Sequence, residues 1–314
     1  MKVLITPRGF HKVGQTYVKL MEDHGLTVHY NDTGLAYTHE EFIALAHDAD
    51  AIIVGVDRMD REMMSQCPNL RVICKFGVGT DNIDLDYARE SGIHVGRTVG
   101  SNSRSVAEHV MALMFAESKN IYPVVRDVKA HKWEKPTGYE LAQKTLGIVG
   151  FGAIGKHLAT IANGIGMNVV AYDAFDIPNE TATSYQTSVV SFDTLIATSD
   201  YISLHVPLTD ETANMFSEKT FNQMKNTASI INAARGGIVD EDALYRALVN
   251  RDIRAACFDV FSIEPPSHDE KLLELDNFLL TPHTASRTVE SELRTCEMSS
   301  QIVMEHLGVE VKHG

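Results

Sequence analysis

The feature that most restricts how this chain can fold is a glycine-rich turn between an apolar run and an amphipathic segment. The apolar run Leu146–Val149 leads directly into Gly150, Gly152 and Gly155. Apolar residues then recur three or four positions apart, at Ile154, Leu158, Ile161 and Ile165. Because this interval places side chains on one face of a helix, the pattern predicts a buried strand, a tight turn and a helix.

A second strand and an acidic residue complete this unit. The helix stops at Gly164 and Gly166, and the strand Val169–Tyr172 leads into Asp173. In dinucleotide-binding folds the first glycine permits the turn, the second lets a pyrophosphate approach the backbone, and the third lets helix and strand pack closely. The helix N-terminus then offers N–H groups and a positive dipole to the phosphates. We therefore predict a dinucleotide site rather than an ordinary turn.

Asp173 distinguishes between the two nicotinamide dinucleotides. Its carboxylate is placed to accept hydrogen bonds from the diol of an adenosine ribose, and it would repel a ribose 2′-phosphate. The next three residues, 174–176, contain no Arg or Lys that could bind such a phosphate. The sequence thus predicts NAD rather than NADP as the cofactor.

Length and composition exclude several classes of protein. A chain of 314 residues allows about two domains, and 44% hydrophobic with 22% charged residues is typical of a globular protein. A formal net charge of −14 argues against nucleic acid or an anionic membrane as a partner. No apolar run is long enough to span a membrane, and the apolar N-terminal stretch is too short for a signal peptide. We expect a cytoplasmic protein.

The cysteines and histidines indicate neither disulfides nor a metal site. The four cysteines form no Cys-x-x-Cys pair and lie far apart, at Cys67, Cys74, Cys257 and Cys296. We expect buried thiols in a reducing compartment. The 14 histidines form no cluster with metal-ligand spacing, and His39-Glu40 lacks the second His of a zinc-protease helix. No bound metal is expected.

Residues 1–98 alternate between strands and helices. The expected strands are Lys2–Thr6, Thr27–Tyr30, Ala51–Val56, Arg71–Phe76 and His94–Val95, and two of the expected helices are Val13–His24 and Leu85–Ser91. Thr38 and Glu41 predict a capping box at the start of a further helix that ends near Ala49. Strands that alternate with helices predict a parallel, doubly wound sheet.

The second part of the chain predicts another α/β domain. A long helix is expected from Ser103 to about Asn120, strands follow the glycine-rich unit, and Val289–Leu307 reads as an amphipathic helix. Residues 181–190 are too polar and β-branched to assign. The predicted fold class is α/β with two doubly wound parallel-sheet domains: a Rossmann domain at 99–285, inserted into a flavodoxin-like domain made of 1–98 and 286–314.

Three strand ends in the second domain carry candidate catalytic residues. One strand leads to Arg235, the next to Asp259 and Glu264, and the last to His283. Ligands of open parallel sheets bind beyond the carboxyl ends of the strands, where an Arg can bind a carboxylate through two hydrogen bonds. A surface Arg and a structural His are the alternatives for each residue alone, but their occurrence together at strand ends favours a site.

The combined motifs resemble those of the D-2-hydroxyacid dehydrogenase family. The order and spacing of the matching segments agree over nearly the whole chain, at 75–84, 106–109, 150–155, 205–209, 232–236, 258–265 and 281–283, with Trp133 in a loop. The resemblance implies reversible hydride transfer between NAD and a D-2-hydroxy acid. It also implies that the Rossmann domain binds NAD and that the flavodoxin-like domain binds the substrate.

The resemblance implies a role for each candidate residue. His283 would be the acid and base that protonates the carbonyl oxygen, and Glu264 would pair with it so that protonated imidazole persists near neutral pH. Arg235 would bind the substrate carboxylate and polarise the carbonyl. The implied cofactor contacts are Ala153 and Ile154 at the pyrophosphate, Asp173 at the ribose, and Val206, Ala233 and Asp259 towards the nicotinamide. Gly150, Gly152 and Gly155 form the turn of this cofactor site, with the roles given above.

The implied substrate-binding residues are Lys75, Gly77, Val78 and Gly79. The motifs are most similar to those of members that act on D-3-phosphoglycerate and 3-phosphohydroxypyruvate. Those members tend to have an Arg where this chain has Lys75 and another where it has Gly55. Arg58 and Arg61 could replace the second, or they could be solvated helix charges. A reductase of glyoxylate, hydroxypyruvate or another small 2-oxo acid is the alternative.

Two further expectations concern assembly and regulation. The helix from Ser103 and the loop around Trp133 resemble a subunit contact of the family, which implies a homodimer or tetramer, unless this face packs on its own domain. The sequence ends 31 residues after His283, so a C-terminal regulatory domain is not expected. An NAD-sensing, corepressor-like binding protein is a remote alternative function, but the long tails and peptide groove of such proteins have no counterpart in the sequence.

Overall fold

The computed structural model describes residues 1–309, and the chain forms two compact units. The first comprises Met1–Asn102 and Arg287–Gly314, of which 310–314 lie outside the described residues; the second comprises Ser103–Ser286. These units and the predicted domains are divided at nearly the same positions. The assignment of substrate binding to the first unit stays a prediction.

The first unit contains a five-stranded parallel sheet in the order β2-β1-β3-β4-β5. Its strands are β1 (Lys2–Ile5), β2 (Thr27–Tyr30), β3 (Ala51–Val54), β4 (Val72–Lys75) and β5 (His94–Arg97). This is the flavodoxin-like strand order, in which the switch point lies between the first and third strands. The predicted doubly wound parallel sheet is confirmed for this unit.

Helices cover both faces of this sheet. The helices α1 (Phe10–Val13), α2 (Gln15–Asp23) and α13 (Val289–His306) share one buried cluster with β1, β3 and β4, while α3 (His39–Ala46), α4 (Arg61–Ser65) and α5 (Leu85–Glu90) share the other. The predicted capping box is present: Thr38 accepts a hydrogen bond from the Glu41 N–H, and Glu41 accepts one from the Thr38 N–H. The helix predicted from Val13 begins only after Gly14.

The second unit contains a seven-stranded parallel sheet in the order β12-β11-β10-β9-β6-β7-β8. Its strands are β6 (Thr145–Val149), β7 (Asn168–Tyr172), β8 (Thr187–Val189), β9 (Tyr201–Leu204), β10 (Ser229–Asn232), β11 (Ala255–Phe258) and β12 (Phe278–Leu280). Counted within the unit, this is the Rossmann order with one additional strand, and its switch point lies between β6 and β9. The predicted Rossmann fold is confirmed.

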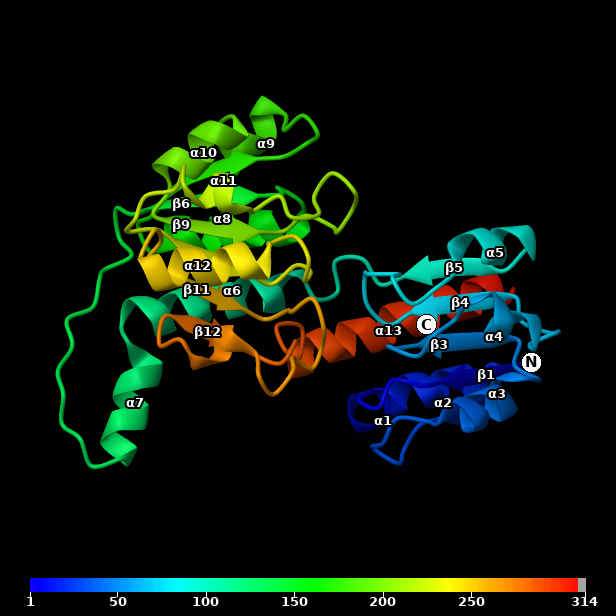
Figure 1. Cartoon of the computed structure of the whole chain (residues 1–314). Helices are drawn as coiled ribbons and strands as arrows, with labels where there is room; N and C mark the ends of the chain where they lie inside the picture. The colour runs from blue at the N-terminus through cyan, green and yellow to red at the C-terminus, as the bar shows by residue number, and fades with distance from the viewer. Residues whose placement is uncertain (310–314) are drawn as a thin grey trace. The chain divides into compact units, whose positions relative to one another are not determined.

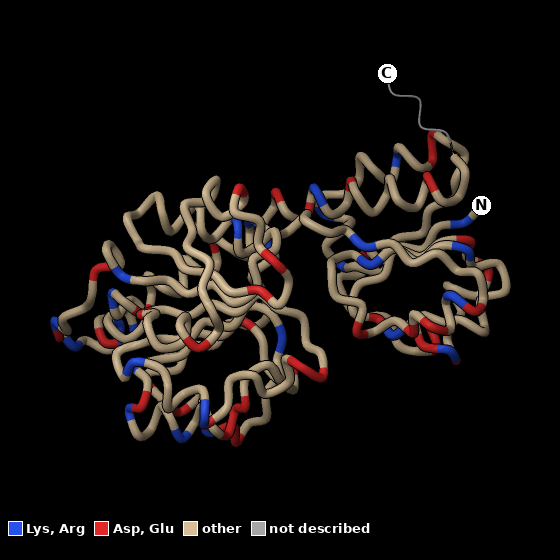
Figure 2. The backbone as a smooth tube through the Cα atoms, turned by 90° about the horizontal axis from the view of Figure 1, so that it is seen from above, with Lys and Arg blue, Asp and Glu red and all other residues tan. Residues whose placement is uncertain are grey.

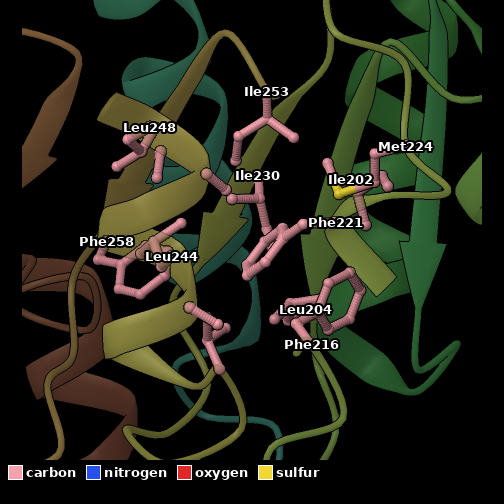
Figure 3. Close-up of a cluster of buried hydrophobic side chains, with 14 of the residues drawn as sticks. Ile202, Leu204, Phe216, Phe221, Met224, Ile230, Leu244, Leu248, Ile253 and Phe258 are labelled. Carbon is pink, nitrogen blue, oxygen red and sulfur yellow. The ribbon is translucent and has the colours of Figure 1, made fainter. Parts of the chain in front are cut away.

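Two helical layers enclose this sheet (Figure 1). One layer contains α6 (Ser103–Ser118) and α8 (Ala153–Gly164), and the other contains α10 (Phe192–Thr198), α11 (Glu218–Phe221) and α12 (Glu241–Asn250). Figure 3 shows Phe221 from the second layer beside Ile230 of the sheet, in a buried cluster that also contains Leu244. The segment 181–190, left unassigned from the sequence, contributes the end of α9 (Asn179–Ser184) and the edge strand β8.

The helix α7 (Ile121–Lys129) was not predicted from the sequence, and neither were α10, α11 and α12. Helix α7 contains no buried residue, and with the returning chain it projects away from the sheet (Figure 1). The segment that leads from α7 back to the sheet is fixed at Tyr139. The Tyr139 N–H donates to Ser118 O at 2.7 Å, and the centroid of its ring lies 4.7 Å from the Arg254 guanidinium carbon. A short 3₁₀ helix, Lys271–Glu274, precedes β12.

Charged residues are mixed along both units (Figure 2), so the net charge of −14 is spread over the chain rather than gathered in one segment. Across residues 1–309, no helix has both the length and the apolar character that would let it cross a membrane.

Candidate active site

The glycine turn after β6 is shaped by close backbone packing. Gly150 has φ +97°, which L side chains rarely adopt, and a Cβ there would lie 2.6 Å from the carbonyl oxygen of His205. A Cβ on Gly155 would lie 2.5 Å from the carbonyl oxygen of Gly150. A Cβ on Gly152, by contrast, would meet no atom within 4 Å. The turn is therefore packed against β9 and against its own helix, but it is open where a ligand would approach.

The N-terminus of α8 and Asp173 complete a cradle for a dinucleotide. No side chain caps the helix at Gly152, so its first N–H groups, which include those of Ala153 and Ile154, point into the open space. Asp173 follows β7, and its carboxylate accepts hydrogen bonds from the N–H of Phe151 at 2.6 Å and of Phe175 at 3.0 Å. These residues fit NAD, because the helix end can receive its pyrophosphate and the fixed carboxylate its ribose diol.

Arg235 is carried by a loop that Asn232 shapes. Asn232 is fully buried at the end of β10. Its side-chain amide donates to Arg235 O at 2.9 Å, and its side-chain oxygen accepts from the N–H of Ala234 at 3.0 Å. The Arg235 side chain is half-buried and donates to Ala234 O at 2.7 Å. The sequence analysis assigned no role to Asn232, although it belongs to the motif 232–236. Its two hydrogen bonds show that it positions the backbone of Arg235.

His283 and Glu264 form a hydrogen-bonded pair. Nδ1 of His283 lies 2.8 Å from Oε2 of Glu264, and both side chains are partly exposed. His283 has φ +53°, an uncommon conformation for a residue other than glycine, and such strain is concentrated at functional sites. Since Nδ1 faces the carboxylate, the other ring nitrogen, Nε2, is the one available to a substrate oxygen.

Asp259 holds the loop that carries His283. It is only 1% exposed. Its Oδ1 accepts from the Thr281 hydroxyl at 2.5 Å and from the Thr284 N–H at 2.9 Å, while Oδ2 accepts from the Ala285 N–H at 2.8 Å. These contacts fix the loop on both sides of His283, and the predicted contact of Asp259 with the cofactor stays a prediction.

The remaining cofactor candidates also lie at this edge of the sheet. Val206 and Ala233 are half-buried just after β9 and β10. The seven strands are parallel, so the segments that follow β6, β7, β9, β10, β11 and β12 all emerge at their carboxyl edge, on both sides of the switch point. The structure thus brings together all the predicted cofactor residues and the three predicted catalytic residues of the second unit.

The first unit places its candidates at the carboxyl edge of its own sheet. Gly77 has φ +144°, and its N–H donates to Thr98 Oγ1 at 2.9 Å. Within residues 1–309, no hydrogen bond uses the N–H groups of Val78 and Gly79. Two backbone donors of this loop are therefore available to an anion, and their role in binding a substrate carboxylate stays a prediction.

Lys75 lies in a polar network around Gly55. Its ammonium donates to Gly55 O at 2.5 Å and to the Asn82 side-chain oxygen at 2.7 Å, and the Asn82 amide donates to Gly55 O and Asp57 O.

The two arginines considered as phosphate ligands, Arg58 and Arg61, have other partners. Arg58 pairs with Asp60 at 2.8 Å and is 81% exposed.

Arg61 forms contacts with two other residues on the surface of the first unit. It pairs with Glu90 at 2.9 Å and lies over the Tyr87 ring at 4.6 Å from its centroid. These contacts favour the alternative given above, solvated helix charges, for Arg61.

The thiols and the acidic groups indicate no other chemistry. All four cysteines are free and buried, as predicted. Burial raises the pKa of the Cys67 thiol to about 11 and those of Cys74 and Cys296 to about 12, so they stay protonated and unreactive near neutral pH. In the described part of the chain, no group of three or more His, Cys, Asp or Glu residues is arranged to hold a metal ion.

Comparison with known proteins identifies the family. Residues 111–285, more than half of the chain, match the family model for "D-isomer specific 2-hydroxyacid dehydrogenase, NAD binding domain". The chain belongs to this family. The predicted family and the NAD-binding character of the second unit are thereby confirmed.

Individual relatives of this dehydrogenase family differ in their named substrates. A D-3-phosphoglycerate dehydrogenase of Archaeoglobus fulgidus is 41% identical over 93% of this chain, which spans 55% of that relative's length. A hydroxypyruvate reductase of Thermotoga maritima is 38% identical over 86% of this chain and 89% of its own. The crystal structure of a D-lactate dehydrogenase of Aquifex aeolicus with NAD and lactic acid has a TM-score of 0.82 and 31% identity, over 98% of this chain and 96% of that one.

Proposed function

We propose that the protein is an NAD-dependent dehydrogenase that interconverts a D-2-hydroxy acid and its 2-oxo acid. The observation that carries the proposal is the pair formed by His283 and Glu264 at 2.8 Å. This pair follows the last two strands of the sheet whose glycine turn fits a dinucleotide, and Arg235 follows the strand beside them. An acid/base, an anion-binding Arg and a cofactor cradle are what hydride transfer to a 2-oxo acid requires.

Each side chain has a defined part in this reaction. When bound, NAD supplies or accepts the hydride. Arg235 binds the carboxylate of the substrate and orients its C2. His283 delivers a proton from Nε2 to the C2 oxygen during reduction and removes it during oxidation, while Glu264 stabilises the protonated ring through Nδ1. The substrate-binding roles of Lys75, Gly77, Val78 and Gly79 in the first unit remain predictions.

D-3-phosphoglycerate is the substrate that we propose first. Its support is the matching motif set and the 41% identity to a D-3-phosphoglycerate dehydrogenase. Hydroxypyruvate or glyoxylate is the second candidate. It is supported by the hydroxypyruvate reductase relative, which this chain covers almost fully, and by Arg58 and Arg61, whose partners are Asp60 and Glu90.

The experiment is a steady-state panel of 2-oxo acids with NADH, including 3-phosphohydroxypyruvate, hydroxypyruvate, glyoxylate and pyruvate. The proposal expects turnover of at least one of them, and the lowest KM names the substrate. His283→Ala should lower turnover by about 10²–10⁴-fold and leave NADH binding nearly intact. A wild-type protein that binds NADH but reduces none of these acids would instead support the NAD-sensing alternative.

We also propose that the protein is a homodimer or a dimer of dimers. The apolar side of α6, expected to form the subunit contact, is buried in the core of its own unit, so the proposed contact is instead the surface of α7 and the loop around Trp133. Ile121, Tyr122, Val125 and Val128 are each about half exposed on this helix, and Trp133 is 77% exposed in the following loop. An apolar surface of this kind on a projecting segment is typical of a subunit contact.

A cytoplasmic location is proposed as well, because all four cysteines are free thiols, which are typical of a reducing compartment.

A further inference from the structure

The carboxylate of Glu241 binds a loop that belongs to the candidate site. Glu241 is the first residue of α12, and its Oε1 accepts hydrogen bonds from the Ser262 N–H at 2.9 Å and the Ser262 hydroxyl at 2.7 Å. The Glu241 side chain does not cap the helix, because Asp240 is the N-cap residue and accepts a hydrogen bond from the Ala243 N–H at 3.0 Å. Glu241 therefore acts on the loop 259–265 rather than on its own helix.

This loop sets the orientation of Glu264. The N–H of Phe261, one residue before Ser262, donates to Glu264 Oε1 at 3.0 Å, while Oε2 of the same carboxylate faces His283. One oxygen is thus fixed by the loop backbone and the other is presented to the imidazole. Phe261 is buried in the core of the unit, whereas Ile263 is 75% exposed, so apolar packing holds the loop before Ser262 but not after it.

The same loop is packed against the segment that carries Arg235. A Cβ on Gly236 would lie 2.2 Å from the carbonyl carbon and oxygen of Phe261 and 2.4 Å from the nitrogen of Ser262. The peptide between Phe261 and Ser262 therefore lies directly on Gly236, and Glu241, five residues further along, accepts a hydrogen bond from the N–H of the same peptide. The segments bearing Arg235 and Glu264 are joined at this peptide.

We propose that Glu241 is a positioning residue for proton transfer: by holding Ser262, it fixes the Glu264 carboxylate against His283 and in register with Arg235. The inference rests on the proposed function. Glu241 does not reach the reacting atoms through any of its hydrogen bonds, so it acts only through the loop.

The surroundings of Glu241 raise its pKa overall, and the hydrogen bonds from Ser262 oppose that shift. Burial raises the pKa of Glu241, and the nearby Glu270 and Asp242 raise it further, while the two hydrogen bonds from Ser262 lower it. The position at the start of α12 also favours a negative charge. The two hydrogen bonds from Ser262 thus favour the ionised form of Glu241, which is the form that binds the loop.

Three variants separate positioning from a general structural effect. Glu241→Ala removes the acceptor for Ser262. Glu241→Gln keeps a side-chain oxygen that can accept the same two hydrogen bonds. Asp242→Ala is the matched control, because it removes a negative charge from the same helix turn, but from an exposed residue.

The kinetic outcome is a pattern across these variants. Glu241→Ala should lower kcat for reduction about ten- to a hundredfold, as expected for a displaced catalytic pair, and should move the alkaline limit of the rate profile to lower pH. Glu241→Gln and Asp242→Ala should stay within about threefold of the wild type. An unshifted pH limit in Glu241→Ala, or an equal loss in Asp242→Ala, would overturn the proposal.

Two further measurements test the route through Glu264. In the Glu264→Gln background, Glu241→Ala should shift the pH limit no further, because residues that act in one chain are not additive. The second is a proton NMR titration of the His283 ring, assigned by comparison with His283→Ala, and it requires no turnover. Glu241→Ala should lower its midpoint, and an unchanged midpoint overturns the positioning role even if no substrate is found.

Discussion

Nδ1 of His283 lies 2.8 Å from Oε2 of Glu264, although 19 residues separate them in the chain. The two residues follow neighbouring parallel strands, β11 and β12, and both are held by the segment that follows β11. Asp259 binds the backbone on the far side of His283, and the Phe261 N–H binds Glu264. The pair is therefore built by the sheet edge before any substrate arrives, which is the preorganisation that acid/base catalysis requires.

The first prediction concerns this pair. Glu264→Gln removes the negative charge beside the imidazole but keeps a hydrogen-bonding side chain, so the protonated ring loses stabilisation. The rate of 2-oxo acid reduction should then begin to fall at a lower pH than in the wild type. The measurement is kcat/KM for reduction between pH 5 and 10, and a profile that coincides with that of the wild type would show that Glu264 has only a structural role.

The second prediction concerns cofactor choice. Asp173 is fixed by the N–H groups of Phe151 and Phe175, so its charge cannot move away from a ribose 2′-phosphate. NAD should be preferred over NADP by at least about 10²-fold in kcat/KM, or ~3 kcal/mol. Asp173→Ala should narrow this ratio mainly by weakening NAD. Asp176→Ala, which changes an exposed acid nearby, should leave it unchanged, and equal efficiency of both cofactors with the wild type contradicts the prediction.

The third prediction concerns assembly. Val125→Asp places a charge on the exposed apolar side of α7 and should shift the protein towards monomers, because a charge buried in an interface without a partner costs several kcal/mol. Light scattering over a range of concentrations gives the mass. Val249→Asp is the control, since Val249 is also about half exposed on a helix, α12. A wild-type mass that equals the monomer at every concentration rules out the proposed dimer.

The fourth prediction concerns acid stability. Burial lowers the pKa of His205 to about 3, well below its ordinary value of 6.5, and its Nδ1 is buried without a hydrogen bond in the described structure. The folded state resists the proton that the unfolded state accepts, so stability is full above about pH 6.5 and falls as the pH is lowered. Between pH 7 and pH 5, the wild type should lose about 2 kcal/mol of unfolding free energy through this residue.

His205→Gln removes that titration and should lose correspondingly less. Urea unfolding at pH 7 and pH 5 measures the difference for each variant. His268→Gln, a change at an exposed histidine, is the control and should behave like the wild type. If His205→Gln loses as much stability on acidification as the wild type does, His205 is not the group responsible.

Local patterns in the sequence predicted much of the fold. Among the contacts between distant residues, the pair of Glu264 and His283 was expected from the family resemblance alone, and others were not predicted. The capping box of Thr38 and Glu41 and the turn around Gly150 depend on neighbours in the chain, and both are present. By contrast, Asp259 binds residues 22 to 26 positions away and Glu241 binds Ser262 21 positions away. No periodicity or spacing marks such pairs, because only the folded sheet edge brings them together.

The position of α7 shows the same limit in another way. Its apolar residues have the helical interval that normally indicates a buried face, yet none of its residues is buried within the chain. The periodicity of a helix indicates that one face is apolar, but it does not indicate what covers that face.

The prediction that the candidate site lies at the strand ends succeeded because a parallel sheet places all carboxyl ends at one edge. Residues as far apart as Gly150 and His283 could therefore be assigned to one side of the unit.

The last prediction concerns the substrate. Lys75 is the last residue of β4 and donates to Gly55 O and to Asn82 in a network at the carboxyl edge of its sheet. Arg58 and Arg61, by contrast, pair with Asp60 and Glu90. If the substrate carries a phosphate, replacing its ligand with Ala should raise KM for 3-phosphohydroxypyruvate about tenfold or more, since a charge-assisted hydrogen bond contributes ~1.5–3 kcal/mol.

The three basic residues give distinct outcomes for the two candidate substrates. For a phosphorylated acid, at least one of Lys75→Ala, Arg58→Ala and Arg61→Ala should raise KM for 3-phosphohydroxypyruvate without changing that for hydroxypyruvate. For a small unphosphorylated acid, the two arginine variants should be silent, and Lys75→Ala should affect both acids alike, because it disturbs the network around Gly55. A wild-type KM for 3-phosphohydroxypyruvate no lower than that for hydroxypyruvate decides against D-3-phosphoglycerate, since the charged phosphate would then contribute no binding energy that the shorter acid lacks.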